Sequence, residues 1–281
     1  SKPSCALLTP ISAMICFPNA KINLGLHVVS RRPDGYHCIE TVFYPVPLCD
    51  ALEIVPAEDF SFHTYGLAID GAADDNLVMR ALSTMRQQAD IPPAAIHLKK
   101  TIPFGAGLGG GSADAAFMLK LLRDYASLSL TDDALERIAA RLGADCPFFV
   151  RNRPVMATGI GDVFSPANVS LAGYHIAIVK PAVSVSTREA YGAIRPSAPA
   201  VPLDEIICRP VTEWRDALKN DFEAPVFALH PTIGTIKTQL YAAGAVYAAM
   251  SGSGSAVFGL FEREPSLPAF TDCFVWQGKV Q

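Results

Sequence analysis

The sequence predicts an α+β protein, and three observations lead to this fold class. Apolar and polar residues alternate through most of residues 14–55, which is the period of β-strands. A glycine-rich stretch at 102–116 leads into a segment whose apolar residues recur with the period of a helix. The second half of the chain contains further short strand-like and helix-like segments, without an internal repeat.

The first of these regions predicts a mostly antiparallel sheet. Residues 22–28 alternate, residues 31–35 (RRPDG) supply a turn, and the alternation resumes in 39–44 and again in 51–55. Consecutive strands that are joined by so short a turn run in opposite directions.

Helices are predicted on both sides of the glycine-rich stretch, over residues 76–88, 112–125 and 131–142. Asp74 or Asp75 is expected to cap the first helix. Residues 95–100 are predicted to form the strand that leads into the glycine-rich stretch. The third helix is expected to end at Gly143 in the left-handed conformation.

The second half is predicted to contain strands at 155–157, 174–179, 245–250 and 256–261 and a helix at 233–243. The proline-rich segment 196–202 is the candidate linker or excursion that divides the two halves. Residues 1–13 are rich in Ser and Pro, and we expect a loose leader there without a function.

Composition limits the class of function. Half of the 281 residues are hydrophobic and 18% are charged, as in an ordinary globular protein, and the formal net charge of −4 argues against a general nucleic-acid binder. No apolar run is long enough to span a bilayer and no signal sequence is apparent, so we expect no membrane partner and a cytoplasmic protein. Seven scattered cysteines without C-x-x-C spacing favour reduced thiols, and no residue is assigned as a metal ligand.

The glycine-rich stretch has the features of a phosphate-binding loop. Its five glycines allow successive backbone N–H groups to converge on one point, and the helix that follows adds its unpaired N-terminal donors. The alternative is a flexible turn before a helix, which requires neither a proline at the start nor five glycines. Polyphosphate is therefore the expected ligand.

Two common phosphate-binding motifs do not fit. Gly105, Gly107 and Gly110 satisfy G-x-G-x-x-G, but the region about 20 residues later (129–135) is a helix start and not a strand ending in an acidic residue. The P-loop motif is absent because no Gly-Lys-Ser or Gly-Lys-Thr occurs in the chain. A dinucleotide-dependent oxidoreductase is therefore disfavoured.

Two charged residues are candidates for chemistry. Asp145 is followed by Cys-Pro-Phe-Phe, and a carboxylate among apolar residues can have a tuned pKa, although a helix-capping aspartate is the simpler interpretation. Lys21 lies within a predicted strand, where lysine is usually solvent-facing. It shares one strand face with Asn19 and Asn23, and these three residues form a polar surface that is suited to binding a substrate.

Five motifs, taken in order, carry a resemblance to one family. They are residues 18–24 (PNAKINL), 32–37 (RPDGYH), 103–116 (PFGAGLGGGSADAA), 143–149 (GADCPFF) and 250–255 (MSGSGS). From Pro18 to about Phe261 the chain resembles the galactokinase, homoserine kinase, mevalonate kinase and phosphomevalonate kinase (GHMP) superfamily. The second and fourth motifs are specific to the branch that phosphorylates 4-diphosphocytidyl-2-C-methyl-D-erythritol, in the non-mevalonate route to isoprenoid precursors.

The resemblance implies a two-domain α+β fold of the GHMP kinases. Residues 1–160 would form an N-terminal β/α domain similar to domain 2 of ribosomal protein S5, which carries the glycine loop. Residues 161–281 would form a C-terminal α/β sandwich, with the active site in the cleft between the domains. A small-molecule partner and a monomer or weak homodimer are expected.

The resemblance also implies the reaction. The γ-phosphoryl group of ATP, with Mg²⁺ as second cofactor, would be transferred to the 2-hydroxyl of the substrate, with Asp145 as base or hydroxyl-orienting group and Lys21 beside it. The implied ATP-binding residues are Pro103, Gly105, Ala106, Gly107, Leu108, Gly109, Gly110, Gly111 and Ser112. Relatives often have Ser-Ser after the glycines, whereas this chain has Ser112-Ala113 and so lacks the second hydroxyl. Ser112 can also serve as the helix N-cap.

For the substrate, the resemblance implies that Tyr36 stacks on cytosine and that His37 hydrogen-bonds the edge of the base. Tyr191, spaced from Thr187 as in the family, is either a second stacking ring or core of a short helix. The implied substrate-binding residues are Asn23, Tyr36, His37, Thr187 and Tyr191. The alternatives are another GHMP kinase acting on mevalonate, homoserine or a sugar, and an inactive nucleotide-binding regulator.

Overall fold

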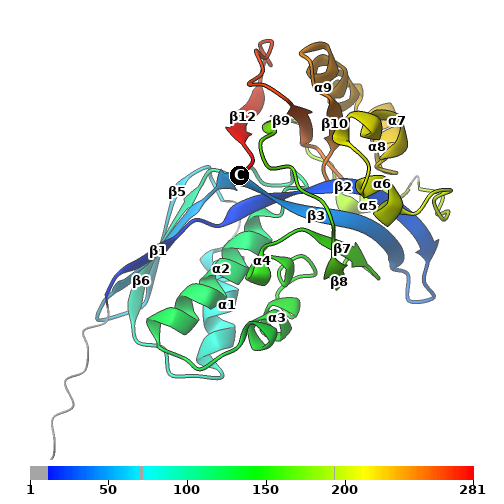
Figure 1. Cartoon of the computed structure of the whole chain (residues 1–281). Helices are drawn as coiled ribbons and strands as arrows, with labels where there is room; N and C mark the ends of the chain where they lie inside the picture. Colours follow the sequence, from blue (N-terminus) through cyan, green and yellow to red (C-terminus); the bar gives the residue numbers. More distant parts are fainter. Residues whose placement is uncertain (1–11, 70–71, 193) are drawn as a thin grey trace, which may run out of the picture.

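Residues 12–69, 72–192 and 194–281 are described by the computed structural model, and within them lie three four-stranded sheets (Figure 1). The first has the order β1-β4-β6-β5, with bounds Met14–Cys16, Ala51–Pro56, Ala94–Lys100 and Ser61–Gly66. The second is β2-β3-β7-β8, at Asn19–Arg31, His37–Cys49, Val155–Thr158 and Val163–Pro166. The third is β10-β11-β9-β12, at Tyr247–Met250, Val257–Phe261, His175–Pro181 and Cys273–Lys279.

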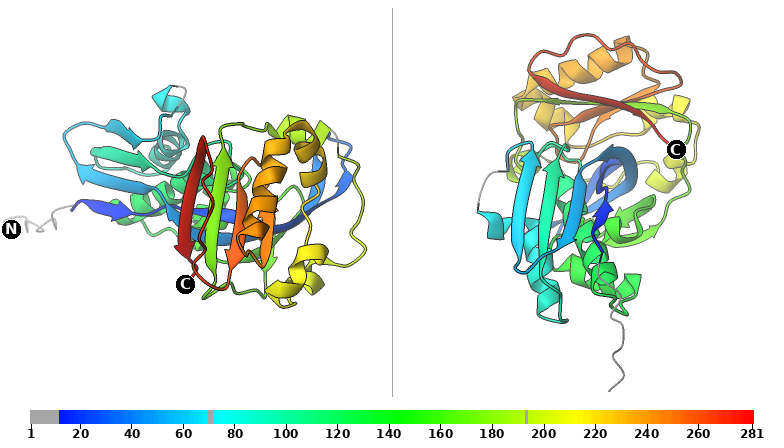
Figure 2. Two further views of the ribbon diagram at one scale, coloured as in Figure 1. Left: turned by 90° about the horizontal axis from the view of Figure 1, so that it is seen from above. Right: turned by 90° about the vertical axis from the view of Figure 1, so that its left-hand side faces the viewer.

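Most neighbouring strands are antiparallel, and β5 and β6 are a parallel pair. The predicted α+β class is therefore confirmed. The long β2–β3 hairpin crosses the molecule, with the helices of the first half on one side and the third sheet on the other (Figures 1 and 2). Of the expected leader, residues 1–11 lie outside the described residues.

Short helices cover these sheets. In the first half they are the 3₁₀ turn η1 (Ala73–Asp75), α1 (Leu77–Arg86), α2 (Gly110–Tyr125), α3 (Asp132–Ala140) and α4 (Phe148–Arg151). In the second half they are α5 (Thr187–Gly192), α6 (Leu203–Ile207), η2 (Val211–Glu213), α7 (Trp214–Ala217), α8 (Glu223–Leu229) and α9 (Pro231–Ala242). Among the described residues, no helix is both long enough and apolar enough to cross a membrane.

The start of α1 corrects one prediction. Asn76 caps this helix, since its side chain accepts a hydrogen bond from the backbone N–H of Val78 at 2.9 Å. Asp74 and Asp75 lie in the 3₁₀ turn η1 before it, so neither is the cap. Asn76 has the extended backbone that a cap requires, and a residue within a turn does not.

The end of α3 corrects another. This helix ends at Ala140 with Arg141 as its C-cap in the right-handed helical conformation. Gly143 does not have a positive φ, so the prediction of a left-handed cap there is wrong. The chain instead continues in turns that carry Asp145 into α4.

β2 is buried on both faces, which places polar side chains inside the molecule. Ala20, Ile22 and Leu24 pack into a core shared with the third sheet. Lys21 and Asn23 lie on the opposite face and are also buried. The period-two face predicted for the polar residues therefore exists, but it faces the interior rather than solvent.

The segment after α5 is part of the C-terminal half and is not the linker. The backbone N–H of Ser197 donates to the Val28 carbonyl at 3.0 Å, and the N–H of Leu26 donates to the Lys219 carbonyl at 2.9 Å. Leu203, Ile206, Val211, Trp214 and Leu218 fill the core beside β2. The proline-rich residues 196–202 are therefore an excursion within the C-terminal half that lies against β2. The connection between the second and third sheets is at residues 167–174.

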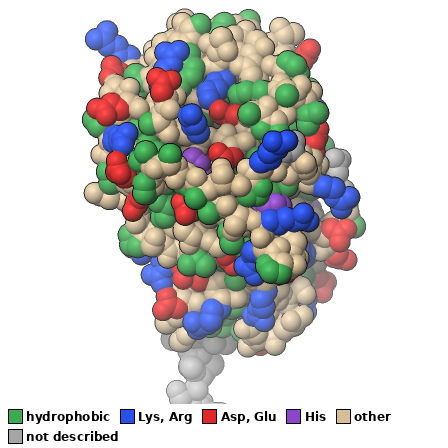
Figure 3. All heavy atoms as spheres, turned by 90° about the vertical axis from the view of Figure 1, so that its right-hand side faces the viewer, with side chains coloured by type: hydrophobic (Ala, Val, Ile, Leu, Met, Phe, Trp, Pro, Cys, Tyr) green, Lys and Arg blue, Asp and Glu red, His purple; other side chains and the backbone are tan. Residues whose placement is uncertain are grey.

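The surface shows no segregation of charge on the face of Figure 3, where positive and negative side chains are interspersed. The described cysteines at 16, 38, 49, 146, 208 and 273 are free thiols, as expected for them.

The predicted domain boundary at 160/161 falls in the turn between β7 and β8, which pair with each other. The division at that point remains a prediction.

Candidate active site

A cavity of about 310 Å³ lies where the two halves meet. It brings together predicted site residues from distant parts of the chain, namely Lys21, Asn23, Gly105, Gly107, Gly109, Asp145, Thr187 and Tyr191. The loop between β10 and β11 closes another side with Gly252, Ser253 and Gly254. We call this cavity the cleft.

A second cavity, of about 230 Å³, is lined by every predicted ATP-binding residue from Pro103 to Ser112. Leu77, Lys100, Ile102 and Phe104 complete its wall. Gly105, Gly107 and Gly109 line both cavities, so the glycine loop forms the partition between them.

Lys21 and Asp145 form an ion pair in the cleft. The Lys21 Nζ lies 3.6 Å from the Asp145 Oδ2, with 5% of the lysine side chain and 35% of the aspartate side chain exposed. Nζ also donates to Asn23 Oδ1 at 2.7 Å and to the Gly107 carbonyl at 3.1 Å. Phe43 lies beneath it, with the ring centroid 4.8 Å from Nζ.

Burial lowers the pKa of the Lys21 ammonium from its ordinary value of 10.5, and the Asp145 carboxylate opposes this effect. The ammonium is thus fixed in place by acceptors on several sides, in an environment where its charge is little screened. Asp145, by contrast, keeps access to the cleft. The arrangement holds a cation beside a carboxylate that a ligand can reach.

The glycine loop is held by the loop between β10 and β11. The Ser251 hydroxyl donates to the Gly107 carbonyl at 2.9 Å, and the Ala256 N–H donates to the Ala106 carbonyl at 3.1 Å. Gly107 has φ +75, and a Cβ there would lie 2.0 Å from the Ser251 carbonyl oxygen. Only glycine allows this close approach.

Asn220 supports the same loop from below. Its buried side-chain amide donates to the carbonyls of Met250 and Gly252, both at 2.8 Å, and its oxygen accepts from the Phe222 N–H at 3.0 Å. Sequence reasoning missed Asn220, because a lone asparagine after a short helix has no distinguishing pattern. The glycine loop is thus connected to β2 and to the C-terminal half.

Ser112 lies within the first turn of α2 and is not its N-cap. The cap is Gly109, in the left-handed conformation and without a side-chain hydrogen bond, because α2 begins two residues earlier than predicted. The Ser112 hydroxyl oxygen lies 4.0 Å from the position that a Cβ would take at Gly143, so Ser112 lies beside the turn that carries Asp145.

A buried charged cluster supports the start of the glycine loop. The Lys100 ammonium pairs with Asp50 and with Asp114 Oδ2, the latter at 2.7 Å. Asp50 Oδ1 accepts from the backbone N–H groups of Thr101 and Ile102, at 2.5 and 2.8 Å. Burial raises the pKa of the Asp114 carboxyl well above its usual value. The cluster ties β6, α2 and the β3–β4 corner together beneath the loop.

At the other end of the cleft, aromatic side chains from residues far apart in sequence pack against one another. We call them the aromatic group. The His37 ring stacks on Tyr191 with centroids 4.6 Å apart, and Phe222 meets Tyr191 edge-on at 4.8 Å. Tyr36 is 62% exposed and lines neither the cleft nor the glycine-loop cavity. Tyr191 lies on the short helix α5 and also lines the cleft, so it is exposed to a ligand there and its stacking on the base remains a prediction.

The comparisons with known proteins agree with this geometry. Residues 76–153 match the family described as GHMP kinases N terminal domain, and residues 206–273 match GHMP kinases C terminal. A 4-diphosphocytidyl-2-C-methyl-D-erythritol kinase of Parabacteroides distasonis is 58% identical, covering 95% of this chain and 100% of that protein. One of Bacteroides thetaiotaomicron is 56% identical over the same shares.

A crystal structure of 4-(cytidine 5'-diphospho)-2C-methyl-D-erythritol kinase superposes with a TM-score of 0.76 at 36% identity, covering 88% of this chain and 90% of that one. The fold and the loop therefore define a small-molecule kinase of the GHMP class that uses ATP as phosphoryl donor. Within that class, the chain belongs to the 4-diphosphocytidyl-2-C-methyl-D-erythritol kinase family.

Proposed function

We propose that this chain transfers the γ-phosphoryl group of ATP to the 2-hydroxyl of 4-diphosphocytidyl-2-C-methyl-D-erythritol, with Lys21 and Asp145 as its catalytic residues. The observation that carries the proposal is their ion pair in the cleft, facing the glycine loop on one side and the His37–Tyr191 aromatic group on the other. The proposed donor site on the glycine loop and the proposed base-binding site would then flank this ion pair.

ATP binds with its phosphates on the glycine loop. The backbone N–H groups of the loop and of the first turn of α2 are donors for phosphate oxygens, and the positive end of the helix dipole favours their charge. The cavity beyond the loop, with the apolar side chains of Leu77 and Phe104, suits the purine. The γ-phosphate then points across the loop toward the cleft.

Asp145 orients the substrate hydroxyl and accepts its proton. Lys21 neutralises charge on the transferred group, and its contact with Asp145 favours the ionised carboxylate. Phosphoryl transfer depends mainly on positioning and on charge stabilisation, which such a fixed pair supplies.

Mg²⁺ accompanies the nucleotide. The described residues contain no group of three or more His, Cys, Asp or Glu side chains suited to a metal, which fits an ion held chiefly by ATP phosphates and water. The Ser112 hydroxyl and the Asp145 carboxylate are oxygen donors beside the loop that suit Mg²⁺. When bound, the ion neutralises phosphate charge.

The cytidine binds at the aromatic end. Tyr191 offers a stacking face and Tyr36 a second one from the β2–β3 turn, while His37 supplies hydrogen bonds to the edge of the base. In the structure His37 covers Tyr191, so the base displaces the imidazole from that ring when it enters. Asn23 and Thr187 contact the substrate nearer to the phosphates.

Two alternatives are disfavoured. A kinase for mevalonate, homoserine or a sugar needs no aromatic clamp for a base, and the relatives of highest identity are named for the cytidine substrate. An inactive regulator has no need of a matched lysine and carboxylate. A monomer or weak homodimer and a cytoplasmic location remain predictions.

The Asp145→Asn variant tests the assignment. We expect turnover to fall by about 10² to 10⁴, the usual contribution of a general base, with ATP affinity retained because the glycine loop is untouched. ADP release reports turnover and calorimetry with a non-hydrolysable ATP analogue reports affinity. The exposed Asp59→Asn is the matched control. Turnover that is unchanged in Asp145→Asn would mean that Asp145 is only structural.

A further inference from the structure

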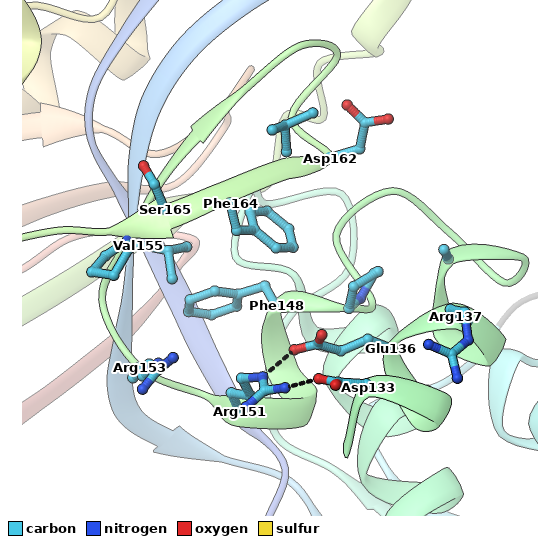
Figure 4. Close-up of a pocket in the computed structure, with 14 residues that line it drawn as sticks. Asp133, Glu136, Arg137, Phe148, Arg151, Arg153, Val155, Asp162, Phe164 and Ser165 are labelled. Atoms are coloured by element: carbon cyan, nitrogen blue, oxygen red, sulfur yellow. Dashed lines mark hydrogen bonds and ion pairs between the residues drawn. The ribbon is translucent and has the colours of Figure 1, made fainter. Parts of the chain in front are cut away.

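A cavity outside the cleft has the features of a second ligand site. It has a volume of about 580 Å³, exceeding that of the cleft, and shares no lining residue with it. α3, α4 and the β7–β8 hairpin form its walls (Figure 4). Nothing in the proposed kinase reaction uses it.

Its floor is apolar. Pro147, Phe148, Val155 and Phe164 contribute to the lining, and the two phenylalanine rings lie at the centre of the view in Figure 4. Phe148 is almost fully buried. A flat or branched apolar group would cover this floor and remove its exposed part from water.

Its rim is charged, and within the described part of the chain two of its three arginines are unpaired. Arg151 is bound to Glu136 at 2.7 Å and also to Asp133, so its guanidinium is occupied. Arg137 and Arg153 form no ion pair among the described residues, and they flank the cavity on opposite sides of Figure 4. Asp162 is likewise without an ion pair among the described residues, and its carboxylate accepts a hydrogen bond from the backbone N–H of Ile160. As far as the structure describes it, the rim thus presents two unpaired guanidinium groups against one unpaired carboxylate, so an anion can pair with Arg137 or Arg153.

The floor is connected to Lys21 through the ring of Phe43. Phe43 meets Phe148 edge-on at 5.4 Å and Phe164 at 6.2 Å. The other side of Phe43 belongs to the cleft, where Lys21 lies over its ring. Phe148 also follows Asp145 by three residues. A ligand that shifts either floor ring therefore alters the packing around Lys21 and Asp145.

We propose that this cavity is an effector site for organic anions with an aromatic body, which act on turnover through Phe148 and Phe43. The anionic group pairs with the guanidinium of Arg153 or Arg137 and the apolar body lies on the phenylalanine floor. Binding of an anion at this cavity does not depend on the proposed kinase function. The effect on turnover does rest on that function.

The test uses 8-anilinonaphthalene-1-sulfonate as the probe, with a non-hydrolysable ATP analogue and cytidine diphosphate filling the cleft. We expect saturable fluorescence, with affinity weakened about tenfold or more in Arg153→Glu combined with Arg137→Glu, since a charge-assisted contact is lost. Arg263→Glu, an exposed arginine after β11, is the matched control and should bind as the wild type does. Ala140→Trp, which places an indole ring in the cavity, should weaken binding as well.

Thermal melting of each variant establishes that it is folded. The proposed site would be overturned if the double arginine variant and Ala140→Trp bound the probe with the same affinity as Arg263→Glu. For the effector role, saturating probe should change kcat at least twofold in the wild type and not in the double arginine variant. Binding at the cavity with kcat unchanged would overturn that role.

Discussion

Lys21 is the residue that decides how the site works. A lysine inside an alternating strand is normally solvent-facing, but both faces of β2 are covered here. Lys21 is therefore only 4% exposed, and its ammonium contacts Asn23, Gly107 and Asp145. The sequence pattern placed Lys21 and Asn23 on one face correctly. It could not predict their burial, because this depends on the C-terminal half packing over β2.

The alkaline side of the rate profile tests the state of Lys21. Because burial lowers its pKa, the ammonium loses its proton below 10.5, and kcat/KM should fall as pH rises through that lowered value. Asp145 raises the same pKa, so Asp145→Asn should move the fall to still lower pH. The measurement compares the pH dependence of the residual ADP release of Asp145→Asn with the pH dependence of ADP release by the control Asp59→Asn. A fall at or above 10.5 in the wild type would contradict this assignment.

Tyr191 tests the base-binding end. Tyr191→Phe keeps the ring and should leave the KM for the cytidine substrate nearly unchanged. Tyr191→Ala removes the stacking face, worth about 1–3 kcal/mol per base, so KM should rise roughly tenfold or more while the KM for ATP stays the same. Initial rates with each substrate varied in turn give both constants. An equal KM for the cytidine substrate in both variants would show that Tyr191 is only core.

At the scale of the elements, the glycine loop depends on its contact with the loop between β10 and β11. The sequence predicted both loops and the strands beside them, since glycine-rich segments between alternating runs give strong local signals. It did not predict that Ser251 lies on Gly107, which is a contact across 144 residues. It also missed β5, β8 and β12, because short edge or half-exposed strands lack a clear alternation.

Gly107→Ala tests that contact. A Cβ would meet the Ser251 carbonyl oxygen, and the positive φ adds about 1–2 kcal/mol of strain. Gly173→Ala is the control, since Gly173 has φ +91 and nothing within 4 Å of its Cβ. We expect urea unfolding to show a markedly larger loss of stability for Gly107→Ala and, where it folds, a raised KM for ATP. Equal losses in the two variants would show that the loops are not in tight contact.

At the scale of the whole molecule, the cleft exists because β2 contacts both halves. Lys21 and Asn23 come from that strand, Asp145 from the turn before α4, and Thr187 and Tyr191 from α5. The family resemblance predicted that these residues meet, although composition and periodicity could not, since they carry no information on contacts between distant segments. The segment from the proline-rich excursion at 196–202 to Leu218 packs against β2 and holds the halves together.

The most direct measurement is product analysis with the wild-type chain, ATP and Mg²⁺. With 4-diphosphocytidyl-2-C-methyl-D-erythritol we predict one ADP released per substrate consumed, and a new phosphomonoester on the 2-hydroxyl by phosphorus NMR. Mevalonate and homoserine should give no ADP above background. Turnover with either of these, and none with the cytidine substrate, would contradict the account.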